Sequence, residues 1–283
     1  MRLLALVFWV IVLSAFLFGQ DTLTIQDLKW DENSPAGFVE LTIPSGGSLM
    51  QGFLYRANGK QKHPTLLLLH GYPGNERNLD LAQVVRARGW NVIYFNYRGS
   101  WGSQGKFSFE NTVEDVVNVV DYCEKNQEKL QIDPANIVLF GHSMGGWVLL
   151  KALQRLPTVR KGFALSTWNI YSDFKDVKSQ DQLLKIVKDP KASPGYFVLN
   201  SPPEAIFAPV VERPAYFDPK NDAKALADKQ IVMLDEHPDN KALADALRGS
   251  NKAYFDYQVW KTDHSFTNKR VSLINMVLSF LAR

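Results

Sequence analysis

The sequence has a single cysteine, Cys123, among its 283 residues. One cysteine excludes an intrachain disulfide and a cysteine-based metal site, and we expect Cys123 to be a small buried apolar residue. The chain also lacks a run of Lys or Arg, and its net charge is only +3, so nothing favours nucleic acid as a partner. No internal repeat or low-complexity tract is present. The length suits one large α/β domain or two small ones, with an ordinary apolar content.

Residues 1–20 stand apart from the rest of the chain. Arg2 is followed by a nearly unbroken apolar run from residue 3 to residue 18, as in a secretory signal peptide. The usual small-x-small cleavage site is missing, so an uncleaved N-terminal anchor is the alternative. We therefore expect a domain over residues 21–283 that is secreted or periplasmic, or else membrane-anchored and facing out of the cytoplasm. Membrane contact is expected only if this segment stays uncleaved.

Beyond residue 37, apolar runs typical of strands alternate with helical patterns. We expect strands at 38–44, 48–55, 65–69, 92–95, 137–140, 161–165, 230–234 and 254–260, and helices at 79–88, 112–123, 147–153, 182–188, 241–247 and 268–282. Thr112 with Asp115 resembles a capping box, and Gly249 resembles a helix stop. The alternation predicts an α/β fold, a mostly parallel sheet of about eight strands with helices on both faces.

Residues 168–226 interrupt this alternation after the sixth strand. They are rich in aromatic residues and prolines. A long insertion of this kind is typical of a cap or binding region, although a surface excursion with locally packed aromatics is the simpler reading. We expect a cap that helps to form the binding site for a substrate with an apolar or aromatic part.

The segment Gly141-His142-Ser143-Met144-Gly145 lies between an expected strand and an expected helix. A strand that ends in Gly-x-Ser-x-Gly and turns at once into a helix is a nucleophile elbow. Gly141 and Gly145 leave room for the close approach of strand and helix. The sequence therefore predicts Ser143 as a nucleophile, against the alternative of a glycine-rich turn without chemistry.

A serine hydroxyl needs an adjacent base to take its proton. Of the five histidines, His264 follows the last expected strand, on a loop at the carboxyl edge of the sheet, and we predict it as the base. His237 is a less favourable alternative. His70 is expected to brace the glycine loop that follows it, and the side chain of His142 to point away from Ser143.

The acid that orients the base should follow the strand at 230–234. Asp239 is far enough along that loop to turn back toward His264, and we predict it as the acid, with Asp235 as the main alternative.

An oxyanion needs two backbone N–H donors. We predict Met144, directly after the nucleophile, and Tyr72 in the loop His70-Gly71-Tyr72-Pro73-Gly74, because Pro73 has no N–H. Gly71 and Gly74 support that loop.

With these motifs, the chain from about residue 37 onward resembles the α/β-hydrolase superfamily. The stretch Tyr97-Arg98-Gly99-Ser100-Trp101-Gly102-Ser103-Gln104-Gly105 is similar to a loop of feruloyl-esterase-type and prolyl-oligopeptidase-like domains. The resemblance implies a serine hydrolase with a Ser143–Asp239–His264 triad and Tyr72 and Met144 at the oxyanion hole. Epoxide hydrolases and dehalogenases share the His-Gly-x-Pro-Gly loop but place Asp at the elbow, so Ser143 argues against them.

We therefore expect a carboxylic ester hydrolase that acts on a small-molecule ester or amide and needs no metal or organic cofactor. A peptidase or amidase with the same triad is the second hypothesis, and a non-catalytic binding module of the same fold is the third. The sequence leaves the substrate and the oligomeric state open.

Overall fold

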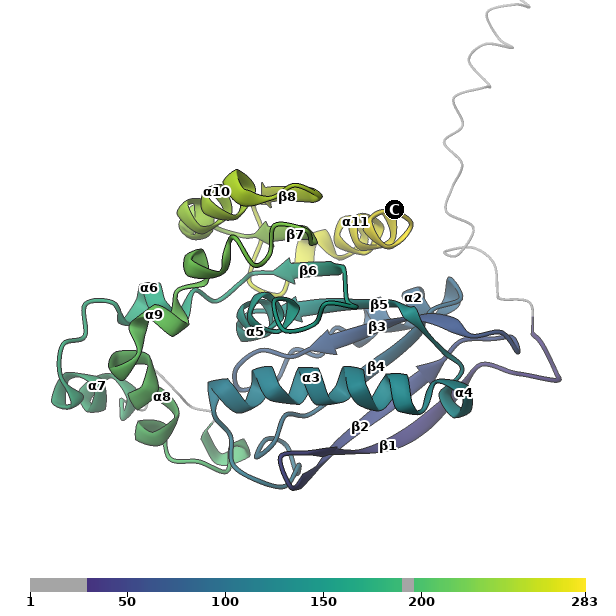
Figure 1. Cartoon of the computed structure of the whole chain (residues 1–283), viewed down its shortest axis with the longest axis horizontal. Coiled ribbons are helices and arrows are strands. Elements are labelled where there is room, and N and C mark those ends of the chain that lie inside the picture. The colour runs from purple at the N-terminus through teal and green to yellow at the C-terminus, as the bar shows by residue number, and fades with distance from the viewer. Residues whose placement is uncertain (1–29, 190–195) are drawn as a thin grey trace, which may run out of the picture.

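The computed structural model describes residues 30–189 and 196–283. Within these residues one eight-stranded sheet has the order β1-β2-β4-β3-β5-β6-β7-β8 (Figure 1). The strands are β1 (Gly37–Ser45), β2 (Ser48–Arg56), β3 (His63–Leu69), β4 (Asn91–Phe95), β5 (Ile132–His142), β6 (Lys161–Leu165), β7 (Gln230–Asp235) and β8 (Tyr254–Val259). The β1–β2 and β2–β4 pairs are antiparallel, and all the other pairs are parallel. The predicted fold class is confirmed.

The central strands are apolar on both faces because helices cover both sides of the sheet. Along β5, Ile137 and Leu139 belong to one buried cluster, and Val138 and Phe140 belong to the other. Successive side chains of a strand point to opposite faces, so a continuous apolar run supplies both cores.

One face of the sheet is covered by α2 (Leu79–Ala87) and α11 (Arg270–Leu281), and the other by α3 (Phe109–Lys125), α5 (Met144–Leu153) and α10 (Lys241–Ser250). A single turn, α4 (Gln127–Leu130), links α3 to β5. The carboxyl ends of the parallel strands meet at one edge, where the predicted chemistry should gather.

The insertion between β6 and β7 folds into short helices at that edge. They are α6 (Ile170–Phe174), α7 (Gln180–Val187), α8 (Pro203–Glu212) and α9 (Pro214–Phe217), with 3₁₀ turns at Tyr196–Val198 and Pro219–Asp222. Figure 1 shows them together at one end of the sheet, beyond α3 and α5. Buried residues of the insertion, including Ile206 and Phe217, join the core on the α3 and α5 face. The described residues of the insertion, called the cap below, therefore pack onto the domain through this shared core.

Two expected helix ends were wrong. The helix α3 begins at Phe109 with Ser108 as its N-cap, whose hydroxyl accepts a hydrogen bond from the Asn111 backbone N–H at 3.1 Å. Thr112 and Asp115 do not form the expected capping box. The buried carboxylate of Asp115 instead forms an ion pair with Arg98. Gly249 does not stop α10, which runs on to Ser250.

The predicted signal peptide or anchor, residues 1–20, lies outside the described residues. Within the described ranges, no helix is both long enough and apolar enough to cross a membrane.

Candidate active site

Ser143 lies on a sharp turn between β5 and α5. Its backbone has φ 58° and ψ −120°, a conformation that costs energy in a residue other than glycine. A Cβ on Gly141 would lie 2.1 Å from the carbonyl oxygen of Gly145, and a Cβ on Gly145 would lie 2.0 Å from that of Leu69. Strand and helix thus approach so closely that only glycine fits on either side. This is the geometry of a nucleophile elbow, in which strain lifts the serine out of the sheet.

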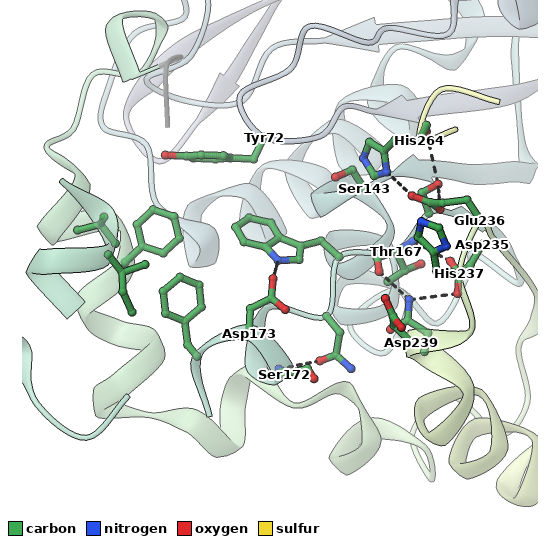
Figure 2. A pocket seen from close by; sticks show the side chains of 18 residues that line it. Tyr72, Ser143, Thr167, Ser172, Asp173, Asp235, Glu236, His237, Asp239 and His264 are labelled. Carbon is green, nitrogen blue, oxygen red and sulfur yellow. Dashed lines mark hydrogen bonds and ion pairs between the residues drawn. The ribbon is translucent and has the colours of Figure 1, made fainter. Parts of the chain in front are cut away.

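His264 lies on the loop after β8, and its ring Nδ1 is 2.6 Å from Oε1 of Glu236. Its other ring nitrogen, Nε2, is therefore left to exchange a proton with a neighbouring hydroxyl. Ser143 and His264 line the same pocket, and Figure 2 shows them side by side with Glu236 beyond. The structure thus brings the predicted nucleophile and the predicted base together.

The carboxylate beside His264 is Glu236, and not the predicted Asp239. The second oxygen of Glu236, Oε2, accepts a hydrogen bond of 2.6 Å from the Ser166 hydroxyl. Burial alone would raise the pKa of Glu236, but the hydrogen bonds from His264 and Ser166 outweigh it and lower the pKa to about 2. Glu236 is therefore an anion at any pH at which His264 can act as a base.

The two aspartates that were considered for this role point elsewhere. Asp235 is buried and accepts hydrogen bonds from the Thr167 backbone N–H at 3.0 Å and from the Asn240 side chain at 3.1 Å. Burial raises the pKa of Asp235 to about 6, against those hydrogen bonds. Asp239 is exposed, and among the described residues it forms no hydrogen bond with His264. Because Asn240 is tied to Asp235 and to the Thr167 carbonyl, the turn at Pro238–Asn240 carries Asp239 outward.

His142, inside the elbow, has a structural role that the sequence did not indicate. Its Nε2 donates a hydrogen bond of 2.9 Å to the His264 backbone carbonyl, and the two rings lie 4.8 Å apart. Burial lowers the pKa of His142 to about 4, so the ring stays neutral near pH 7. His142 thus ties the loop that carries His264 to the turn that carries Ser143.

The loop after β3 lies directly against the elbow. A Cβ on Gly71 would lie 3.0 Å from Cβ of Ser143, and Gly74 has φ 106°. His70 braces this loop, because its Nδ1 donates a hydrogen bond of 2.8 Å to the Gly71 carbonyl. Burial lowers the pKa of His70 to about 4. Met144 is the first residue of α5, where a backbone N–H has no acceptor within the helix.

A pocket of about 530 Å³ opens in front of Ser143. One side is apolar and is lined by Tyr72 and by cap residues that include Phe174, Ile186, Val187 and Phe207. Figure 2 shows the labelled polar residues Thr167, Asp235, His237 and Asp239 on the opposite side from Tyr72. Ser143 therefore lies beside a cavity that has one apolar end and one polar end. Within the described residues, no group of three or more His, Cys, Asp or Glu side chains is arranged to hold a metal ion.

Comparison with solved structures identifies the fold. An esterase of Pyrococcus furiosus superimposes with a TM-score of 0.64 over 91% of this chain and 95% of that chain, at 16% identity. The alpha/beta hydrolase GrgF of a Penicillium species superimposes with a TM-score of 0.61 over 87% and 98%, at 17% identity. The family model described as serine aminopeptidase, S33, matches residues 60–194. These comparisons show that the chain has the α/β-hydrolase fold.

Curated proteins resemble only part of the chain. A segment of 112 residues is 33% identical to the uncharacterized protein RP471 of Rickettsia prowazekii and covers 36% of this chain and 44% of that protein. A segment of 122 residues is 29% identical to the lysophosphatidylserine lipase ABHD12 of Danio rerio and covers 41% and 31%. The chain thus spans less than half the length of either relative.

Proposed function

We propose that the protein is a serine hydrolase that cleaves a carboxylic ester through Ser143, His264 and Glu236. One observation carries the proposal: the Glu236 carboxylate lies 2.6 Å from Nδ1 of His264, in the pocket that Ser143 lines. Glu236 replaces Asp239 as the acid of the triad, because it is the carboxylate in contact with the histidine. Esterase and lipase relatives of the superfamily support the same class of reaction.

In the first step the Ser143 hydroxyl oxygen attacks the acyl carbonyl carbon, while its proton passes to Nε2 of His264. The carboxylate of Glu236 stabilises the positive charge that then appears on the imidazole ring. The backbone N–H groups of Tyr72 and Met144 are proposed to bind the oxyanion. His264 then returns the proton to the leaving alcohol oxygen as the carbon–oxygen bond breaks and the acyl-enzyme forms.

In the second step water attacks the acyl-enzyme. His264 takes a proton from that water and afterwards gives it back to the oxygen of Ser143, which releases the carboxylic acid. Every proton in this cycle moves through His264, so the cycle needs no cofactor. The substrate is a small molecule whose apolar part fits the side of the pocket formed by Ile186, Val187 and Phe207. Export of the protein through its N-terminal segment remains part of the proposal.

A fluorophosphonate probe tests the nucleophile directly. We expect stoichiometric labelling of the wild type and none of Ser143→Ala, while Ser201→Ala, a cap serine outside the pocket, labels like the wild type. Equal labelling of Ser143→Ala, or no labelling of the wild type, contradicts the proposal.

A peptidase or amidase with the same residues is the second candidate, because the matching family model is described as serine aminopeptidase. An ester and an anilide with the same acyl group separate the two activities. We expect kcat/KM to favour the ester after correction for its greater intrinsic reactivity. A preference for the anilide after that correction assigns the protein to the second class.

A further inference from the structure

Two phenylalanines of the cap bound the apolar end of the pocket. Phe174 lies on α6 and Phe207 on α8, and both line the pocket in front of Ser143. The centroids of the two rings are 5.2 Å apart, so the rings are in contact. Phe174 is 8% exposed and Phe207 is 4% exposed, and both belong to the buried cluster on the α3 and α5 face. This end of the pocket is therefore a packed wall.

A second hollow, of about 210 Å³, also adjoins Phe174. Among the described residues, Phe174 is the one residue that lines both this hollow and the pocket in front of Ser143. Val210, in the wall of the second hollow, follows Phe207 by three positions on α8 and continues the same face of that helix. Phe174 is thus the partition between the two spaces. The other walls of the second hollow include Val177, Val210, Val211 and Pro214, with the exposed Lys175 and Lys178.

An acyl chain on Ser143 would be buried along the apolar side of the pocket, past Ile186, Val187 and Phe207. Each methylene group that is buried there leaves water, which should raise kcat/KM about fourfold. That gain stops where the end of the chain meets the ring of Phe174. Further methylene groups would have to remain in solvent or push the packed wall aside, which is unfavourable in a close-packed core.

We propose that Phe174 sets the length of the acyl chain that the enzyme accepts, and that the second hollow is an extension of the acyl site that this ring blocks. The inference rests on the proposed function and deepens it. It names the substrates as esters of unbranched aliphatic acids whose chain ends at Phe174. Phe174 is a specificity-determining residue, and it takes no part in proton transfer.

A series of p-nitrophenyl esters of unbranched acids, from acetate to dodecanoate, tests the proposal. The esters share one leaving group, so differences in kcat/KM below the concentration at which they aggregate report the fit of the acyl chain. In the wild type we expect kcat/KM to rise about fourfold per methylene group up to a limiting length and then to level off or fall. In Phe174→Ala the limiting length should increase by about two to four carbons, because Val210 lies about 4.5 Å beyond Phe207 along α8. The acetate should be hydrolysed as by the wild type.

Two further variants serve as controls. Phe197→Ala removes another phenylalanine of the cap, but Phe197 is 88% exposed and lines neither the pocket nor the second hollow. Its limiting length should be that of the wild type. In the double variant Phe174→Ala/Val211→Phe a new ring occupies the second hollow, and the limiting length should return toward that of the wild type.

An unchanged limiting length in Phe174→Ala, or an equal loss of activity at every chain length, overturns the inference alone. A limiting length that stays extended in the double variant also overturns it, because the chain would then not enter the second hollow. If Phe174→Ala does not fold, Phe174→Leu keeps most of the apolar contact and should extend the limiting length by about one carbon; no extension overturns the inference. If the wild type hydrolyses no ester and fluorophosphonate labelling also fails, the proposed function falls as well.

Discussion

Replacing Glu236 by Gln removes the negative charge beside His264 while it keeps the size of the side chain. The contacts of Glu236 lower its pKa from 4.5 to about 2, which corresponds to about 3 kcal/mol at ~1.4 kcal/mol per pH unit. Part of that shift comes from the Ser166 hydroxyl and the Glu236 backbone and not from His264, and the side chain is 14% exposed. The share that stabilises the charged imidazole is therefore about 1–3 kcal/mol. The imidazole is charged in the transition state, so the loss appears in the rate. We expect kcat to fall by about 10- to 100-fold.

Steady-state kinetics on a neutral ester measures this loss, with circular dichroism to show that the variant is folded. Asp239→Asn, on the same ester, is expected to cost at least tenfold less activity. The reasoning is refuted if Asp239→Asn is the more damaging change, because Asp239 would then be the acid of the working enzyme.

Three further predictions concern positioning and stability. Ser166 has φ 47°, so Ser166→Gly should relieve strain and keep or raise the melting temperature, while kcat falls about threefold to tenfold because Glu236 loses its hydrogen bond; an unchanged kcat contradicts this. His70 and His142 are neutral when folded, with pKa values of about 4 against 6.5 when exposed, so they add stability above pH 6.5 that is lost as the pH falls toward 4. The raised pKa of Asp235 acts in the opposite sense below pH 6 and offsets one of the two histidines. Urea titrations from pH 6 to 4.5 should therefore show the free energy of unfolding falling by about 1.4 kcal/mol per pH unit. A flat profile contradicts the burial of His70 and His142. In Gly145→Ala the new methyl group meets backbone 2.0 Å away, and we expect about 3 kcal/mol or more of destabilisation by thermal denaturation; a variant as stable as the wild type shows that the turn is not closely packed.

The sheet could be predicted from the sequence because its central strands are short apolar runs that are buried on both faces. The run at Ile137–Phe140, for example, supplies alternate side chains to two cores and suits few other structures. The helices of the cap were harder to predict. Pro209 lies inside α8, where a proline ordinarily argues against a helix, and tertiary packing of Ile206 and Phe207 overrides that tendency.

Within the site, Ser143 and His264 were predictable because each follows a strand at the carboxyl edge. Glu236 was not, since it stands next to Asp235, and sequence spacing alone does not tell which of several carboxylates after one strand faces a histidine 28 residues away. Only the fold reveals the Ser166 hydroxyl that holds Glu236. Ser166 follows β6, and its backbone N–H bonds to Leu234 on β7. The contact thus depends on strand order and register, which local sequence does not encode.

The central claim is that Ser143 carries the acyl group during turnover. Trypsin cuts after Lys129 and Lys151 and releases a peptide in which Ser143 is the one serine. We therefore propose to quench the enzyme during turnover of an activated ester, digest it, and find the added acyl mass by mass spectrometry. If Ser143 carries the acyl group, the added mass lies on residues 130–151 in the wild type and is absent in Ser143→Ala. An acyl group on another peptide, or turnover that persists in Ser143→Ala, contradicts it.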